Sequence, residues 1–72
     1  MNEAVTLSGQ VAQRLRARIA DGTWSAGATL PAERRLAEEL GVSRGSLRAG
    51  IAQLQAEGLV EARQGSGTRV CS

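Results

Sequence analysis

The sequence lacks most of the side chains that enzymes use for acid–base and nucleophilic chemistry. Its 72 residues include no histidine and no tyrosine, a single aspartate at Asp21, and a single cysteine at Cys71, next to the last residue. General acids, bases and nucleophiles act in hydrogen-bonded sets of such groups, so we expect no enzyme activity. A single cysteine forms no internal disulfide, and no strong ligands stand at metal-binding spacing. We therefore expect neither a metal nor any other cofactor.

Long apolar segments are also missing. Glu3 interrupts the N-terminus, no apolar run has the length of a signal peptide, and none is long enough to cross a bilayer. Together with the lone cysteine, these absences predict a protein of the reducing cytoplasm. A chain of 72 residues forms one domain, and 12 of its hydrophobic residues are alanine, so we expect a small core.

Lysine is absent as well, since all nine basic residues are arginine; against seven acids they give a net charge of +2. The distribution of the charges is more informative than their sum. Residues 40–56 contain Arg44 and Arg48 and no acid. We expect no carboxylate close enough to neutralise this pair, and therefore a locally positive surface suited to phosphates or base edges.

The N-terminal part of the chain predicts a helix and a loop. Apolar residues recur every four positions at Leu7, Val11, Leu15 and Ile19. This period predicts a helix over about residues 8–20, which ends at Asp21 and Gly22. In the loop that follows, Trp24 is predicted to be a buried plug of the core rather than a base-stacking group. Residues 29–30 are predicted to be a very short extended piece.

Two further helices are predicted at close spacing. Pro31 has the backbone dihedral that a first helical turn requires, so the second helix is predicted over about residues 31–40. Gly41 stands where a helix ends in a left-handed residue, and Ser43 can cap a third helix over about residues 44–57. Helices joined by so short a turn form a helix-turn-helix.

The last segment predicts a β-hairpin. Residues 59–63 and 68–70 resemble short strands and flank the glycine-rich stretch 64–67. A hairpin directly after a helix-turn-helix is a wing, here over about residues 59–70. The predicted fold is therefore a single domain over residues 1–72, mainly α with a small β-hairpin: a winged helix-turn-helix of three helices plus a wing.

The start of the third predicted helix has the chemistry of a DNA-binding surface. An arginine at this place can bind guanine through two parallel hydrogen bonds, to O6 and N7. Arg44 and Arg48 are one turn apart and share a flank of the helix. Ser43 and Ser46 place hydroxyls and backbone N–H groups at the helix N-terminus, where phosphate oxygens are attracted. We expect this end of the helix to enter a major groove.

A motif in the middle of the chain resembles a known family. Residues 30–44 have the sequence LPAERRLAEELGVSR. This stretch is similar to the DNA-binding head of the GntR family of bacterial transcription regulators, whose pattern here is LP-[SA]-ER-x-LA-x-x-L-x-VSR. The resemblance covers about residues 11–70. It implies that Arg34 approaches an operator from the second helix, that Arg44 reads bases, and that Arg48 contacts the backbone or a base edge.

The resemblance also extends to the wing. It implies that Gly65 enters the minor groove, with Gln64 and Ser66 beside it to bond the backbone. The predicted DNA-binding residues are Arg34, Ser43, Arg44, Gly45, Ser46, Arg48, Gln64, Gly65 and Ser66. Gly45 stands where threonine is common in the family, so one hydroxyl contact is missing. Gly45 and Gly50 each weaken the third helix by roughly 1 kcal/mol, unless close packing requires Gly50.

These features predict a sequence-specific binder of double-stranded DNA, the operator-reading domain of a bacterial transcription regulator. Repression by occlusion is the default mode. We expect a homodimer on a short inverted-repeat operator, and the resemblance implies a C-terminal domain that binds a metabolite and supplies most of the dimer contact. The alternative is a winged-helix module that docks protein and does not bind DNA, in which the arginines are merely solvated.

The roles expected for the other arginines are less specific. Arg14, Arg16 and Arg18 are predicted to be a solvated face of the first helix, with phosphate contact by one of them as the alternative. Arg35 is predicted to form surface ion pairs with Glu38 or Glu39. For Arg63 and Arg69 there are two alternative roles: clamping phosphates, or protecting the edges of the hairpin.

Overall fold

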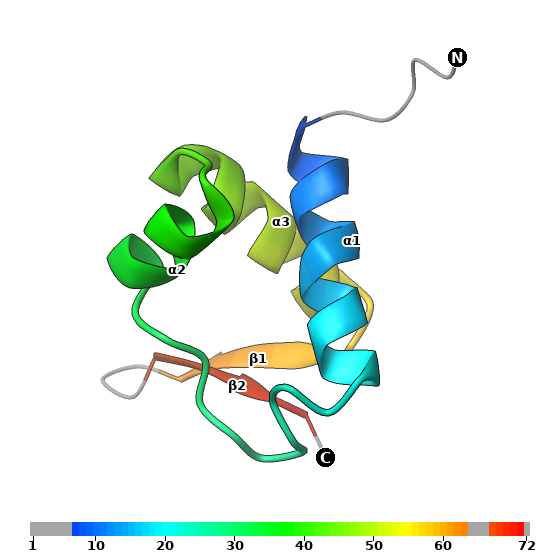
Figure 1. The fold of residues 1–72 in the computed structure, drawn as a ribbon. Helices are drawn as coiled ribbons and strands as arrows, with labels where there is room; N and C mark the ends of the chain where they lie inside the picture. The colour runs from blue at the N-terminus through cyan, green and yellow to red at the C-terminus, as the bar shows by residue number, and fades with distance from the viewer. Residues whose placement is uncertain (1–6, 64–66, 72) are drawn as a thin grey trace.

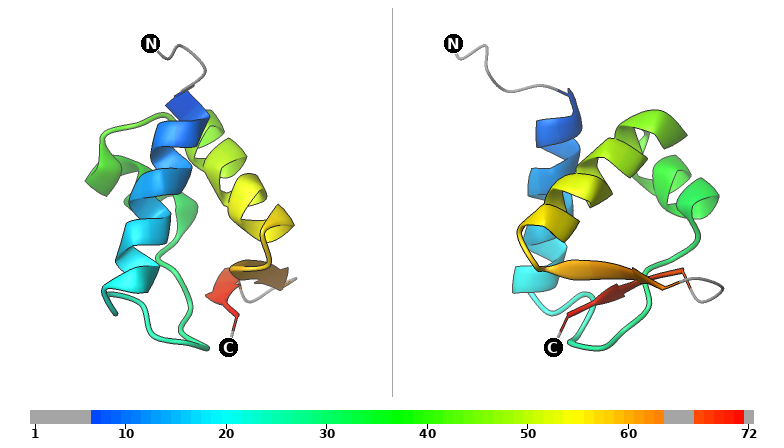
Figure 2. Two further views of the ribbon diagram at one scale, coloured as in Figure 1. Left: turned by 90° about the vertical axis from the view of Figure 1, so that its right-hand side faces the viewer. Right: turned by 180° about the vertical axis from the view of Figure 1, so that it is seen from behind.

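Within the described residues, 7–63 and 67–71, the chain forms three helices followed by a β-hairpin. The elements of this computed structural model are α1 (Leu7–Ala20), α2 (Glu33–Leu40), α3 (Arg44–Ala56), β1 (Val60–Arg63) and β2 (Gly67–Val70) (Figure 1). α3 is central, because it contacts α1, α2 and β1. The hairpin lies across the end of α3, as the two views in Figure 2 show. The predicted winged helix-turn-helix is confirmed.

The helices α1, α2 and α3 end in the same way. After each, a glycine adopts a positive φ: 86° at Gly22, 70° at Gly41 and 79° at Gly58. The next residue donates its backbone N–H to a carbonyl five residues earlier: Thr23 to Arg18, Val42 to Ala37, and Leu59 to Leu54. This pairing satisfies carbonyls that a helix end leaves open, and a residue with a Cβ is strained at the turn. The predicted helix ends are therefore confirmed to within a residue.

The predicted start of α2 is wrong by two residues. α2 begins at Glu33, and its N-cap residue, Ala32, has an extended ψ of 147°. The cause lies in the preceding residues, which pair with β2: Leu30 donates its N–H to the Thr68 carbonyl at 2.8 Å, and Thr29 forms a bridge with Arg69. The predicted extended piece is thus confirmed. The backbone of Ala32 also has an extended ψ, so the helix begins only after it.

Ala32 leaves the N-terminus of α2 without a side-chain cap. Because Ala32 is exposed, serine fits there, and its hydroxyl can accept a backbone N–H of the first turn. We expect Ala32→Ser to raise the free energy of unfolding by about 1 kcal/mol, measured by urea denaturation. The matched control is Ala52→Ser at an exposed position inside α3, which should instead lower it by a few tenths of a kcal/mol. A similar shift in both variants would contradict this prediction.

The core lies between the helices and the inner face of the hairpin. Its buried hydrophobic residues are Val11, Ala12, Leu15, Trp24, Leu30, Leu36, Ala37, Leu40, Leu47, Ile51, Leu54, Val60 and Val70. Among the described residues, no polar or charged side chain is buried. Trp24 is only 9% exposed, which confirms the prediction that it plugs the core. The Arg18 guanidinium covers its ring at 5.6 Å from the centroid.

α1 and α3 pack closely at Gly50, a buried residue in the middle of α3. A Cβ atom at this position would lie 2.7 Å from Val11 Cγ1 and 3.1 Å from the backbone nitrogen of Ala12. Close packing therefore requires glycine at residue 50, which explains why it occurs there despite its low helix propensity.

The hairpin is antiparallel, with Val60 opposite Val70 and Glu61 opposite Arg69. The valines are buried against the helices, whereas Arg69 forms an ion pair with Glu61 at 3.4 Å. Arg69 therefore forms a cross-strand charged pair. The side chain of Arg63 and residues 64–66 lie outside the described part of the chain.

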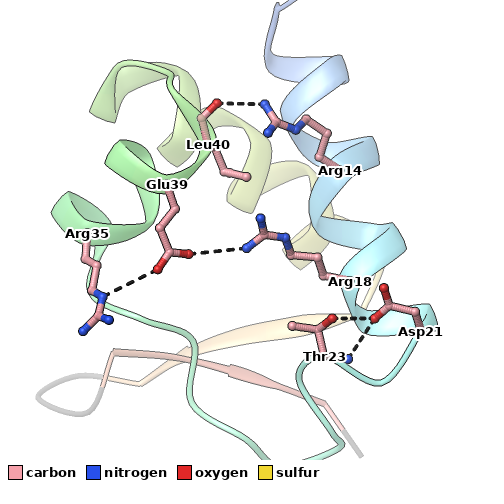
Figure 3. A network of polar contacts seen from close by, with 7 residues as sticks. All are labelled: Arg14, Arg18, Asp21, Thr23, Arg35, Glu39 and Leu40. Atoms are coloured by element: carbon pink, nitrogen blue, oxygen red, sulfur yellow. Dashed lines mark hydrogen bonds and ion pairs between the residues drawn. The ribbon is translucent and has the colours of Figure 1, made fainter.

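The arginines of α1 are at least partly exposed, as predicted for a solvated face, but each also contacts another helix. Arg16 donates two hydrogen bonds to Glu57, at 3.0 Å and 2.7 Å, which join α1 to the end of α3. Hydrogen bonding to Arg16 lowers the pKa of the Glu57 carboxyl. Arg14 and Arg18 contact α2 (Figure 3). Long arginine side chains span the distance between helices, which the periodicity of a single helix does not show.

The end of α1 has its own polar contact. Thr23 donates its backbone N–H and its hydroxyl to one oxygen of Asp21, at 2.8 Å and 2.6 Å (Figure 3). These hydrogen bonds stabilise the charged carboxylate and hold the pKa of Asp21 below its ordinary value. The turn after α1 is therefore fixed both by its backbone and by an Asp side chain.

Candidate nucleic-acid interface

The turn between α2 and α3 places a polar cap at the start of α3. Ser43 has extended backbone dihedrals, and its Oγ accepts the backbone N–H of Ser46 at 3.1 Å. The same hydroxyl donates to Ser46 Oγ at 3.0 Å. The predicted capping role of Ser43 is confirmed. The cap leaves other backbone N–H groups of the first turn without intrahelical partners, which gives this end of α3 a positive potential.

Arg44 and Arg48 lie on α3 with most of each side chain in solvent, at 64% and 68% exposure. The prediction that no carboxylate neutralises them is wrong. Glu33 places one oxygen 3.7 Å from Arg44 Nη2 and the other 3.6 Å from Arg48 Nε. The reason is the helix-turn-helix itself, which brings the first turn of α2 beside the first half of α3.

Glu33 has two physical effects at this surface. At the N-terminus of α2 its negative charge is stabilised by the helix dipole. One carboxylate shared by Arg44 and Arg48 holds both guanidinium groups while leaving most of their N–H donors available. Exposed ion pairs of this length are weak, so they restrict the arginines without a large cost for release.

Two further predicted site residues, Arg34 and Gly45, are exposed in the first turns of α2 and α3. Arg34, in the first turn of α2, is 83% exposed and lies 4.0 Å from Glu38 in a weak pair. Gly45, in the first turn of α3, is exposed, and a Cβ there would meet only Ser43 Oγ at 4.0 Å. Arg35 pairs with Glu39 at 3.5 Å, which confirms its predicted surface ion pair. The predicted wing residues Gln64, Gly65 and Ser66 lie outside the described residues.

A pocket of about 400 Å³ separates the start of α2 from the wing. It is lined by residues 29–33, by Ile51 of α3, and by Gly67 and Thr68 of β2. Glu33 belongs to this lining and also lies within ion-pair distance of Arg44 and Arg48. One residue of α3 and two of β2 therefore line the same pocket.

Residues 7–63 and 67–71 contain no group of three or more histidine, cysteine, aspartate or glutamate residues that could hold a metal ion. No helix within these residues is both long enough and apolar enough to span a membrane.

Comparison with known proteins identifies relatives among bacterial regulators. An uncharacterized HTH-type transcriptional regulator of Mycobacterium tuberculosis is 47% identical in an alignment of 78 positions that covers 97% of this chain and 32% of the relative. A putative L-lactate dehydrogenase operon regulatory protein of Escherichia coli is 53% identical over 62 residues, which cover 86% of this chain and 24% of the relative. The chain thus spans between about a quarter and a third of the length of these relatives.

Solved structures with the same fold include one bound to DNA. AraR(DBD) in complex with operator ORR3 matches with a TM-score of 0.83 and 32% identity, covering 90% of this chain and 78% of that one. Streptococcus agalactiae GntR matches with a TM-score of 0.82 and 40% identity, covering 90% of this chain and 31% of that one. The family model for bacterial regulatory proteins of the gntR family matches residues 7–70. The chain belongs to the gntR family of bacterial regulatory proteins.

Proposed function

We propose that this chain is the operator-reading domain of a bacterial transcription regulator, with α3 in the major groove of double-stranded DNA and the wing in the adjacent minor groove. The observation that carries the proposal is the exposed pair Arg44 and Arg48 at the N-terminal half of α3, held by Glu33. The fold of AraR(DBD), solved with its operator, supports it. Repression by occlusion of a promoter is the proposed mode of action.

The exposed side chains suggest distinct contacts. Arg44, nearest the helix N-terminus, makes the bidentate base contact, and Arg48 binds a base edge or a phosphate. Ser43 and Ser46 bind a phosphate through hydroxyl and backbone N–H groups. Gly45 lets the DNA backbone approach the first turn of α3 closely.

Two further regions complete the proposed contact set. Arg34 reaches the DNA from α2; its exposure and its long pair with Glu38 leave it free to do so. Gln64, Gly65 and Ser66 are proposed contacts of the wing tip in the minor groove, on the basis of the family motif alone.

Glu33 sets the cost of binding. When Arg44 turns to a base, its ion pair with Glu33 is exchanged for two hydrogen bonds to guanine. An exposed ion pair contributes at most about 1 kcal/mol, whereas a bidentate base contact contributes roughly 1–3 kcal/mol of discrimination. The exchange is therefore favourable at the correct base and near neutral elsewhere, which supports sequence selectivity.

Binding is proposed to occur as a dimer on an inverted repeat in the bacterial cytoplasm. A second domain would hold two of these units together, since the relatives are about three to four times longer than this chain. The isolated 72-residue chain is expected to be largely monomeric and to bind a two-half-site operator weakly, because it gains no effective concentration at the second half-site. A tight dimer in sedimentation at micromolar concentration would contradict this expectation.

A salt titration tests DNA binding itself. We expect affinity for a random duplex to fall at least about tenfold between roughly 50 and 200 mM salt, because each neutralised phosphate releases counterions. A selection from a random duplex library then supplies the preferred half-site. A module that docks protein would bind neither the random duplex nor a selected half-site. The absence of salt-sensitive binding to any duplex would therefore overturn the proposed function.

A further inference from the structure

The charges of α2 are arranged unfavourably for a free helix. Its eight residues are too few for independent stability. Arg34 and Arg35 lie in its first turn, while Glu38 and Glu39 lie in its last turn, where no basic residue occurs. The helix dipole favours the opposite order, with acids first and bases last. Glu33 alone is well placed in this respect.

α1 supplies the missing positive charge at the end of α2. Arg14 donates from Nη1 to the carbonyl of Leu40, the last residue of α2, at 2.8 Å. Arg18 lies 3.5 Å from Glu39, which also pairs with Arg35 at 3.5 Å, so that two arginines flank one carboxylate (Figure 3). A guanidinium at a helix C-terminus satisfies an open carbonyl and interacts favourably with the dipole.

The Arg14 contact lies next to the proposed DNA-binding surface along the chain. Leu40 is followed by the turn of residues 41–43 and then by Arg44, so the end of α2 determines where α3 begins. We propose that Arg14 is a positioning residue: without touching DNA, it holds the end of α2 so that Ser43 and Arg44 meet the operator in the correct place. This inference rests on the proposed function.

α1 is held against α3 by contacts other than the one from Arg14. α1 is joined to α3 through buried packing at Gly50 and through the Arg16–Glu57 pair, neither of which involves α2. Loss of Arg14 should therefore loosen the α2 end and the turn locally and leave α1, α3 and the hairpin folded. Loss of a positioning residue of this kind should reduce operator selectivity more than it reduces the free energy of unfolding.

The test compares Arg14→Met with Arg16→Met, which removes the same charge from the same helix but from a contact to α3. Fluorescence anisotropy at about 10 °C gives the affinity of each variant for the selected half-site and for a random duplex. We expect Arg14→Met to weaken half-site binding about three- to tenfold more than random binding, which is the size of effect that one typical hydrogen bond contributes. Arg16→Met should weaken both equally. Arg14→Lys, which keeps charge and donors, should restore most of the selectivity.

Hydrogen exchange at the Val42 and Leu47 amides provides a second measurement. These amides bond to Ala37 and Ser43 carbonyls on either side of the turn, and they should exchange faster in Arg14→Met than in Arg16→Met. Unchanged selectivity and unchanged exchange in Arg14→Met would overturn the positioning role while wild-type DNA binding still stands. Failure of the wild type to bind any duplex would instead overturn the proposed function.

Discussion

Gly50→Val is expected to lower the free energy of unfolding by about 3 kcal/mol or more. A Cβ at residue 50 would lie 2.7 Å from Val11 Cγ1 and 3.1 Å from the backbone nitrogen of Ala12. Valine side chains in helices have one strongly preferred rotamer, so Val11 cannot turn aside, and the Ala12 nitrogen moves only with α1 itself. The two helices must therefore separate along their contact.

Gly45→Val is the matched control, since it makes the same change in the same helix. A Cβ there meets only Ser43 Oγ at 4.0 Å, and the helix propensities of glycine and valine differ by a few tenths of a kcal/mol. Thermal unfolding should show Gly45→Val near the wild type and Gly50→Val lower by roughly 10–20 °C. Equal melting temperatures for the two variants would show that the α1–α3 contact adjusts without cost.

The features that could be predicted from the sequence are those with local causes. Helix ends depend on a glycine and the next few residues, so Gly22, Gly41 and Gly58 marked them correctly. The Ser43 cap acts on a residue three positions away, and the hairpin pairs neighbouring segments. Burial of Trp24 followed from its being the only large aromatic side chain in a chain with a small core.

The features that could not be predicted depend on contacts between distant segments. The start of α2 is delayed because residues 28–30 pair with β2, about 40 positions later. Glu33 reaches Arg44 and Arg48 only after the helix-turn-helix closes. An acid at the start of one helix and arginines at the start of the next could have suggested that contact, although nothing in the spacing distinguishes it from the i,i+4 pairs within α2.

Arg44→Ala is expected to weaken binding to the selected half-site by about 5- to 150-fold, which corresponds to roughly 1–3 kcal/mol. Preference at one base pair should flatten, because the bidentate contact that distinguishes guanine is removed. Stability should change little, since the exposed pair with Glu33 at 3.7 Å contributes at most about 1 kcal/mol. Glu33 keeps Arg48 as its partner at 3.6 Å, so no buried charge is left behind.

Arg35→Ala separates base recognition from general charge. Arg35 is 77% exposed, carries the same charge in the same helix-turn-helix, and is bound to Glu39 on the side of α2 that meets α1. Loss of the Arg35 side chain should weaken binding to the half-site and to the random duplex to the same small extent. Loss of the Arg44 side chain should weaken binding to the half-site far more than binding to the random duplex. If Arg44→Ala instead reduces both affinities equally, Arg44 binds phosphate and base selection lies elsewhere on α3 or in the wing. If it reduces neither, the arginine pair that supports the proposed function does not face DNA.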